Sequence, residues 1–572
     1  VSIDQKTLEE SNILVYRVRE GPKIRIRGLK FEGNTTFTAK QLRAQIETEK
    51  YVLIIKKGEL SEEKLDQDVA RIRKFYQDRG FLDARVDRKI EISPDQQDAV
   101  VSFIIDEGRT YTVRDIQINI VGKPVFSKET IREAMPLKRG SVYSADKLRD
   151  TTEVLLDLYG KVGYLATQDG GQTAIRIERV FDETEPVVDL QVRVREGRPY
   201  KVGNLIIRGN QVTQDRVVRR AIRGLEPGRP YDRSGIAASR RKILESGLFR
   251  DSKITILGEP EDPIRDALVE VKETRTGSIS FGAAISSDSG VLGAFDLSQR
   301  NFDISDFPES LSELASGRAF RGAGQQFGIS IQPGDELQRY SVNWSDPYLF
   351  DSDYFVSVRG QFFTRERSQY DEERYGGFFR FGKRFGDVWS ANASLRYEGI
   401  DITDVAGDAP VDVFDAAGES TLTGLGFNVA RSTVDSRYFP TRGTRLIAGI
   451  ERVGALGGDY EFTKATVESN AFFTVYEDFF GRKTVLSFRN EIGYIFEENE
   501  APVFERFYAG GHSSFRGFDF RGVGPRGFVD IGGGTLVKGD DPVGGQWLFL
   551  LGAEYNFPIY QEMLRAVLFV DS

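Results

Sequence analysis

Apolar and polar residues alternate at every second position over most of the chain after Gly277, and this alternation restricts the fold more than any other feature. In the stretch WSANASLRYE, Trp389, Leu395 and Tyr397 share one face, and the polar and charged residues share the other. Strands of about ten residues with one apolar and one charged face are typical of a transmembrane β-barrel, which turns apolar side chains toward lipid. A water-soluble β-sandwich is the alternative, but its strands are shorter.

The alternation predicts thirteen strands, and the connections between them differ in length on the two sides of the sheet. Long connections at 403–419 and 498–543 lie on one side, and most connections on the other side are short turns, which is the asymmetry of outer-membrane barrels. The segment 303–320 is long on the short-turn side and breaks the pattern. The expected strands lie near 277–286, 290–301, 321–332, 336–346, 353–365, 372–384, 388–402, 420–434, 443–454, 459–475, 481–497, 544–557 and 564–572.

The first half of the chain is built from a repeated unit. The dipeptide Glu-Gly occurs at 20–21, 107–108 and 196–197, each time between two strand-like stretches. In the intervals, apolar residues at helical spacing precede a glycine at positions 80 and 163, where a helix C-cap is expected. The unit reads strand, helix, helix, strand, strand, which is an α+β module. Taken alone, these repeats also fit a generic α+β scaffold.

The composition excludes several classes of function. The net charge is −9, with +6 over residues 1–275 and −15 over 276–572, so a surface for nucleic acid is not expected. Without cysteine, and with His512 as the only histidine, the chain offers no disulfide and no zinc site. We find no nucleophile–base pair and no phosphate loop, so we expect no enzyme and no cofactor. No run of eighteen apolar residues occurs, and a transmembrane helix is therefore not expected.

The repeats resemble the polypeptide-transport-associated (POTRA) domain. The motifs of the second half are more specific, and their order and spacing resemble those of the BamA-type outer-membrane protein assembly factors, a family with POTRA repeats and a transmembrane β-barrel. The motifs are LSQRNF (297–302), WSDPYLF (344–350), DSRYFPTRGTRL (435–446), FYAGGHSSFRGF (507–518), GAEYNFPI (552–559) and LRAVLFVDS (564–572). The resemblance covers nearly the whole chain and departs from the family at 303–320 and at both ends.

The resemblance implies a division of the chain into domains. We expect residues 1–22 to be the tail of a preceding repeat, 23–107, 108–197 and 198–275 to be POTRA repeats, and 276–572 to be an antiparallel transmembrane β-barrel. The family has sixteen strands, so we expect three further strands after Ser572. We also expect earlier repeats and a signal peptide in a longer precursor. The expected location is the bacterial outer membrane, with the repeats in the periplasm.

The function that the resemblance implies is the folding and insertion of β-barrel proteins into the outer membrane, by β-augmentation at POTRA edges and at a lateral seam of the barrel. The implied partners are unfolded barrel substrates, accessory outer-membrane lipoproteins, periplasmic chaperones and outer-membrane lipid. Two alternatives stay open. One is a translocation or secretion pore of the same superfamily, of the two-partner secretion or TamA-like kind, and the other is a passive porin.

The glycine-rich motif at 507–518 is the first candidate site. In the family, this loop folds back into the lumen and docks its Arg-Gly-Phe tip, here Arg516, Gly517 and Phe518, on the barrel wall. An arginine that leaves bulk water needs an acidic partner. Alternation places Glu554 on the polar face of its strand, and Asp571 is the corresponding acid on the next strand. We predict that Arg516 contacts both acids and that Phe518 packs in the lumen; a solvated arginine is the alternative.

The second candidate site is the first barrel strand, GSISFGAAIS. Its small residues Ser278, Ser280, Gly282 and Ala284 weaken packing, which suits a pairing that must open, and we predict that 278–286 forms one edge of a lateral gate. For the segment 303–320 we expect the periplasmic side. Its acids and serines predict a solvated or mobile loop, and a docking surface for an accessory subunit is the alternative.

Overall fold

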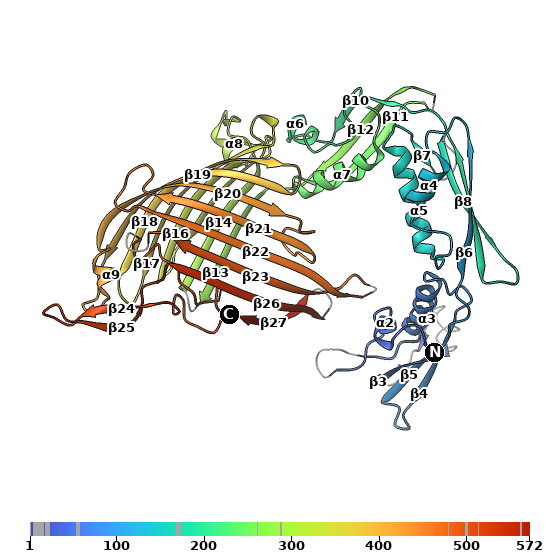
Figure 1. Cartoon of the computed structure of the whole chain (residues 1–572), viewed down its shortest axis with the longest axis horizontal. Coiled ribbons are helices and arrows are strands. Elements are labelled where there is room, and N and C mark those ends of the chain that lie inside the picture. Colours follow the sequence, from blue (N-terminus) through green and yellow to red (C-terminus); the bar gives the residue numbers. More distant parts are fainter. Residues whose placement is uncertain are drawn as a thin grey trace, which may run out of the picture.

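The computed structural model describes residues 2–3, 16–17, 23–52, 58–167, 173–259, 261–286, 289–478, 480–497, 501–512, 514–560 and 563–572. Three α+β repeats form a bent arm that leads to one large curved sheet (Figure 1). The expected tail at 1–22 lies outside the described residues except for the short strands β1 (Ser2–Ile3) and β2 (Tyr16–Arg17). Within the described ranges, no helix is both long and apolar enough to cross a membrane.

Each repeat has the predicted order of strand, two helices and further strands, and its last strand lies in the interior of its sheet. The last strand pairs parallel with the first and antiparallel with the preceding one. The first repeat contains β3 (Arg25–Glu32), α2 (Ala39–Arg43), α3 (Glu62–Gln77), β4 (Arg85–Ile92) and β5 (Asp98–Asp106). The second contains β6 (Thr112–Val121), α4 (Lys128–Ala134), α5 (Ala145–Gly160), β7 (Ala166–Thr167), β8 (Thr173–Phe181) and β9 (Val187–Arg195). The third contains β10 (Lys201–Arg208), α6 (Asp215–Arg219), α7 (Arg233–Glu245), β11 (Phe249–Leu257) and β12 (Ile264–Glu273).

The long helix of each repeat covers one face of its sheet. Ser61, Ser144 and Asp232 cap the N-termini of α3, α5 and α7 by accepting hydrogen bonds from backbone N–H groups of the first turn. The apolar stripes at helical spacing enter the cores, where Tyr76 and Tyr159 are fully buried. Each repeat therefore has its own hydrophobic core.

One acidic residue in each repeat closes the fold by holding the loop that follows the first strand. Glu107 accepts hydrogen bonds from the backbone N–H groups of Thr35 (2.8 Å) and Thr36 (2.9 Å) and from the hydroxyl of Tyr76 (2.9 Å). Glu196 accepts one from Val125 N–H and one from Tyr159, and Glu273 accepts one from Thr213 N–H. Two of these glutamates belong to the Glu-Gly dipeptides of the sequence repeat, whose recurrence thus reflects a shared structural contact.

The second half forms one antiparallel sheet of thirteen strands, as predicted. Every neighbouring pair is antiparallel, and most boundaries lie within about three residues of those expected from the alternation. The strands are β13 (Gly277–Ser286), β14 (Gly290–Phe302), β15 (Gln325–Gln332), β16 (Leu337–Asp346), β17 (Tyr354–Glu366), β18 (Asp371–Phe385), β19 (Trp389–Thr403), β20 (Gly418–Ser432), β21 (Gly443–Val453), β22 (Phe462–Glu477), β23 (Lys483–Ile495), β26 (Trp547–Tyr560) and β27 (Leu564–Asp571).

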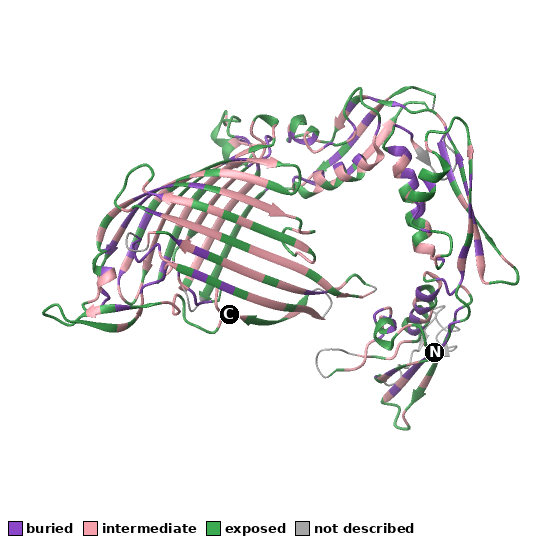
Figure 2. Ribbon diagram, in the orientation of Figure 1, coloured by how far each residue is buried: buried purple, intermediate pink, exposed green. Residues whose placement is uncertain are grey.

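The two faces of this sheet differ as the alternation requires. On β19, Trp389 and Tyr397 are exposed on the outer face, whereas Glu398 is buried on the inner face. Figure 2 shows exposed and less exposed positions alternating along the strands, as expected where successive side chains point to opposite faces of the sheet. Large apolar side chains of this outer face, such as Phe379, Phe427 and Phe488, stay exposed in the described structure. An exposed apolar face of this kind fits a surface covered by lipid.

The long connection between β23 and β26 contains structure that the sequence pattern does not reveal. It carries the hairpin β24 (Arg526–Asp530) and β25 (Leu536–Pro542), which forms a sheet of its own. The connection between β19 and β20 contains the short helix α9 (Val411–Phe414), which packs against β24. Both connections join strand residues in one hydrophobic core at this end of the sheet, with Val413, Phe504 and Phe507 among its buried members.

The segment 303–320 lies at the opposite end, beside the last repeat (Figure 1). It contains the helix α8 (Leu311–Ala315). Its base is not solvated, because Asp303 is buried and accepts a hydrogen bond from the side chain of Gln214 in the third repeat (2.7 Å). Its tip is exposed, so the expectation of a solvated loop describes the tip alone.

Candidate lumenal docking site and first strand

Arg516 lies between the two acids that the sequence analysis selected. Its Nε and Nη2 atoms donate to the two carboxylate oxygens of Asp571, at 2.6 and 2.7 Å, and its Nη1 atom donates to Glu554 at 2.7 Å. The backbone N–H of Arg516 also donates to Asp571 (3.3 Å), and the guanidinium stacks 3.6 Å from the ring centroid of Phe569. The loop is thereby joined to both β26 and β27 through one side chain. Whether this contact anchors the loop during function stays a prediction.

The turns around Arg516 require glycine. Gly510 and Gly517 have φ angles of +113° and +92°, a region that side chains with a Cβ atom rarely adopt. At Gly510, a Cβ atom would stand 2.1 Å from the carbonyl oxygen of Asp519. Phe518 stacks on Phe515 with ring centroids 4.7 Å apart, and its side chain is half exposed rather than enclosed. The glycines let the chain reverse direction beside the sheet.

A second group of charges, which the sequence analysis missed, holds the start of the same loop. Glu505 is buried, and one of its oxygens accepts a hydrogen bond from Arg374 on β18 (3.0 Å) while the other forms an ion pair with Arg396 on β19 (3.1 Å). Arg374 also donates to Glu372 (2.6 Å), and Lys464 on β22 donates to the backbone carbonyl of Glu505 (3.0 Å). Three strands therefore converge on one loop residue, two of them on its carboxylate and the third on its backbone carbonyl.

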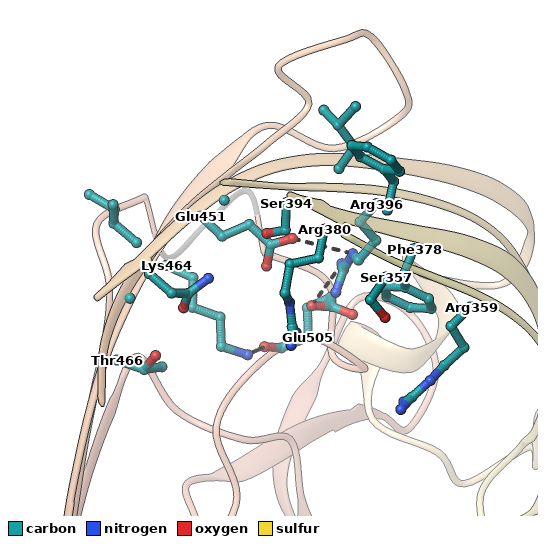
Figure 3. A pocket seen from close by; sticks show the side chains of 16 residues that line it. Ser357, Arg359, Phe378, Arg380, Ser394, Arg396, Glu451, Lys464, Thr466 and Glu505 are labelled. Carbon is teal, nitrogen blue, oxygen red and sulfur yellow. Dashed lines mark hydrogen bonds and ion pairs between the residues drawn. The ribbon is translucent and has the colours of Figure 1, made fainter. Parts of the chain in front are cut away.

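Three of these charged residues, Arg396, Lys464 and Glu505, line a cavity of about 400 Å³ on the inner face of the sheet. Figure 3 shows Arg359, Arg380 and Arg396 directed into it from the strands, with Glu505 reaching in from the loop (Figure 3). The signal for this group was present in the sequence, because Glu372, Arg374 and the residues at 396 and 398 occupy polar-face positions of neighbouring strands. Their partner in the loop, more than a hundred residues away, could not be read from the pattern.

The small residues of the first strand form its inner row. Ser278, Ser280, Gly282 and Ala284 alternate with outer-face residues such as Phe281, and all of these positions are exposed. Among the described residues, β13 pairs with β14 alone, and a Cβ atom at Gly282 would meet only Ala294, at 3.7 Å. There is therefore room for a larger side chain at position 282, and the small residues of the inner row give β13 little side-chain surface to pack against β14.

The described part of the chain contains no group of three or more His, Asp or Glu side chains arranged to hold a metal ion. The acids of both docking sites are instead engaged by arginine. What the arrangement can do is fix a long loop to the inner wall of a sheet and present the backbone of an edge strand.

The model of the Omp85 superfamily domain matches residues 319–572, and the POTRA model, described as a surface antigen variable number repeat, matches residues 24–108, 111–197 and 200–274. The outer membrane protein assembly factor BamA of Neorickettsia risticii (strain Illinois) is 25% identical over 570 residues, which are 96% of this chain and 70% of the relative. That of Nitratidesulfovibrio vulgaris (strain Hildenborough) is 25% identical over 542 residues, or 93% of this chain and 64% of the relative.

The crystal structure of BamA from Haemophilus ducreyi lacking POTRA domains 1–3 has the same fold, with a TM-score of 0.57 and 18% identity, covering 81% of this chain and 86% of that chain. This chain spans 64–70% of the length of the two curated relatives. The repeats, the thirteen-stranded sheet and these matches agree. Residues 319–572 are therefore assigned to an Omp85 superfamily domain, and three POTRA repeats precede the thirteen-stranded sheet.

Proposed function

We propose that the chain folds and inserts β-barrel proteins into the bacterial outer membrane, with its POTRA repeats in the periplasm. The proposal is supported by the combination of POTRA repeats and an antiparallel sheet with an apolar outer face in one chain. The first strand of this sheet has small side chains along its inner face. The curated relatives that match 93–96% of the chain are named outer membrane protein assembly factors.

The proposed mechanism uses backbone hydrogen bonds and no covalent chemistry. An unfolded barrel substrate carries N–H and C=O groups that cost several kcal/mol each when they enter hydrocarbon unpaired. Residues 278–286 of β13 would pair with a substrate strand and satisfy these groups as the strand enters the membrane. The small side chains at 278, 280, 282 and 284 would allow the strand to leave its neighbours at low cost.

The partners of the proposed function follow from its chemistry. The substrates are unfolded outer-membrane β-barrel proteins, delivered by periplasmic chaperones and met first by the POTRA arm. Accessory outer-membrane lipoproteins would bind the periplasmic side, and outer-membrane lipid would cover the outer face. Neither a cofactor nor nucleic acid takes part in this mechanism.

Disulfide trapping tests the role of the first strand, because the sequence contains no cysteine and gives no background. A Ser280→Cys variant is expected to cross-link to cysteines placed in a stalled barrel substrate. Ser341→Cys is the matched control, since Ser341 pairs on both sides, with Ser330 and Gln361. If substrate assembly proceeds while position 280 cross-links no more than position 341, β13 is not the template.

The alternative function, a passive porin, would account for the sheet but not for the POTRA repeats. The hydrophobic core around Phe504 and Phe507, at the end of the sheet near α9, also argues against a pore that is open at this end. Ion conductance in lipid bilayers, together with unchanged assembly of barrel substrates in cells depleted of the chain, would favour the porin over the assembly factor.

A further inference from the structure

The segment 303–320 presents apolar side chains at the end of the sheet nearest the repeats. Phe307 and Leu311 are 72% and 85% exposed, and Leu314 is 50% exposed. Leu311 and Leu314 are three residues apart on α8 and therefore project from the same side of the helix. Exposed leucine and phenylalanine side chains close together on a short loop indicate a surface that lipid or another molecule covers, because their exposure to water is unfavourable.

The position of these side chains identifies the partner. Phe327 belongs to the outer, apolar row of β15, where it pairs with Trp344 of β16. Phe302 stacks on Phe327 with centroids 4.9 Å apart, Phe320 stacks on Phe302 at 5.5 Å, and Phe307 meets Phe320 edge-on at 5.6 Å. A continuous ladder of aromatic rings thus leads from the lipid-facing surface of the sheet to the tip of the loop.

We infer that the tip of this loop, formed by Phe307, Leu311 and Leu314, is a membrane anchor that inserts into the boundary between headgroups and acyl chains of the adjacent lipid leaflet. The inference rests on the proposed placement of the sheet in an outer membrane. Phenylalanine and leucine are typical of the buried face of helices that lie in this boundary, where these side chains lose contact with water. The ladder makes the anchor an extension of the lipid-facing surface.

Charge indicates what drives the insertion. Residues 303–321 carry four acids (Asp303, Asp306, Glu309, Glu313) and two arginines (Arg318, Arg321). Two of the acids are engaged within the protein, since Asp303 is buried and Asp306 accepts a hydrogen bond from the backbone N–H of Arg321 (2.9 Å). The segment therefore has no excess of positive charge that would attract anionic lipid. Insertion is expected to depend on apolar contact and to be as strong in zwitterionic as in anionic vesicles.

The proposed anchor would also affect the orientation of the POTRA arm. The base of the same segment contacts the third repeat through Asp303 and Gln214. The backbone N–H of Gln214 also donates to the carbonyl oxygen of Gly322 (2.9 Å), two residues after the segment ends. Lipid at the tip and the repeat at the base would hold the segment from two sides. The last repeat would then keep a defined orientation relative to the membrane surface.

Depth-dependent fluorescence quenching tests the anchor in the full chain. Single variants Leu311→Cys, Ser312→Cys and Ala391→Cys are labelled with a small fluorophore and reconstituted into phosphatidylcholine vesicles that contain a lipid with a nitroxide near its headgroup end. Ala391 lies on the outer face of β19, two residues from the turn that contacts the third repeat, and reports membrane placement at a similar level. Ser312, a neighbour on α8 away from the leucine side, is the matched control. Heat-modifiable gel mobility verifies that each variant is folded.

The expected result is strong quenching at positions 311 and 391 and several-fold weaker quenching at 312. Quenching at 391 without quenching at 311 overturns the anchor while leaving the proposed function intact; it is also the outcome expected if an accessory protein covers the tip. Absence of quenching at both 311 and 391 overturns the membrane placement itself, and the anchor with it. Loss of quenching at 311 in zwitterionic vesicles but not in anionic ones would contradict the apolar origin of the binding.

Discussion

Arg516 joins the lumenal loop to the last two described strands of the sheet at once, because its guanidinium contacts Asp571 on β27 and Glu554 on β26. Its two bonds to Asp571 are parallel and bidentate, a geometry that only the planar guanidinium provides. The side chain of Asp571 is almost fully buried, so its charge has little access to water. The contact is therefore sensitive to the shape of the cation as well as to its charge.

The first prediction concerns this shape. Arg516→Lys is expected to weaken the docked state by about 1–3 kcal/mol, because lysine keeps the charge but loses the bidentate contact and leaves one acid poorly paired. The measurement is the temperature at which heat-modifiable gel mobility is lost, compared with the unmodified chain. Arg526→Lys serves as control, since the side chain of Arg526 is exposed and donates to the backbone carbonyls of Asp540 and Gly522. Equal midpoints for Arg516→Lys and the unmodified chain would show that the loop does not depend on this contact.

At the scale of the element, each POTRA repeat depends on one carboxylate that holds the loop after its first strand. Burial by itself would raise the pKa of Glu107, but the hydrogen bonds from Thr35, Thr36 and Tyr76 outweigh burial and lower the pKa to about 2. Burial raises the pKa of the Tyr76 hydroxyl, and its hydrogen bond to the Glu107 carboxylate raises that pKa further. The charged form of Glu107 is thus bound more tightly in the folded repeat than in the unfolded chain.

The second prediction follows from the direction of this shift. Because the folded pKa lies below the ordinary value, Glu107 contributes stability above about pH 4.5, and this contribution is lost as the pH falls toward 2. The loss is roughly 3 kcal/mol in the free energy of local opening. Hydrogen exchange of a peptide that covers Thr35 and Thr36, corrected for intrinsic rates, measures it. Glu107→Gln should start with low protection and show little change over this range; an equal pH dependence in the variant would assign the effect to other groups.

At the scale of the whole molecule, the third repeat meets the sheet through a small set of contacts. The side chain of Asn301, at the end of β14, donates to the hydroxyl of Thr213 (2.9 Å), and both residues are buried. Gln214 contacts Asp303, and Lys242 on α7 forms an ion pair with Asp387 in a turn of the sheet (2.9 Å). The first two contacts are buried or nearly so, whereas Asp387 is mostly exposed to solvent.

The third prediction compares the loss of a buried contact with the loss of an exposed one. Asn301→Ala is expected to loosen the arm, because it leaves the buried Thr213 hydroxyl and Gly324 N–H without their partner, at a cost of about 1–3 kcal/mol. Lys242→Gln is expected to change little, since exposed ion pairs contribute about 0–1 kcal/mol. The distribution of distances between a spin label on the third repeat and one on the sheet is measured by pulsed electron paramagnetic resonance. The prediction fails if the distribution broadens in Lys242→Gln and stays narrow in Asn301→Ala.

Much of this molecule could be predicted without coordinates, because the informative signals are local. A strand turns its side chains to alternate faces, so period two alone determined the number of strands, their approximate bounds and which residues face inward. The same parity selected Glu554 as an inward acid, and the resemblance paired it and Asp571 with Arg516. The recurrence of Glu-Gly and of helical spacing determined the order of elements in the repeats, since both arise within one short unit.

The tertiary structure alone decided which distant residues meet. Glu505 meets Arg374 and Arg396 because a long loop folds back across the inner face, and no period in the loop records where its carboxylate ends. The hairpin β24–β25 likewise lies in a stretch rich in glycine, where alternation is weak. In segment 303–320, the acidic composition predicted solvent, yet Asp303 is buried at the base, and Phe307 continues the aromatic ladder. Composition describes the average environment of a segment, whereas burial depends on what the rest of the chain places against each side chain.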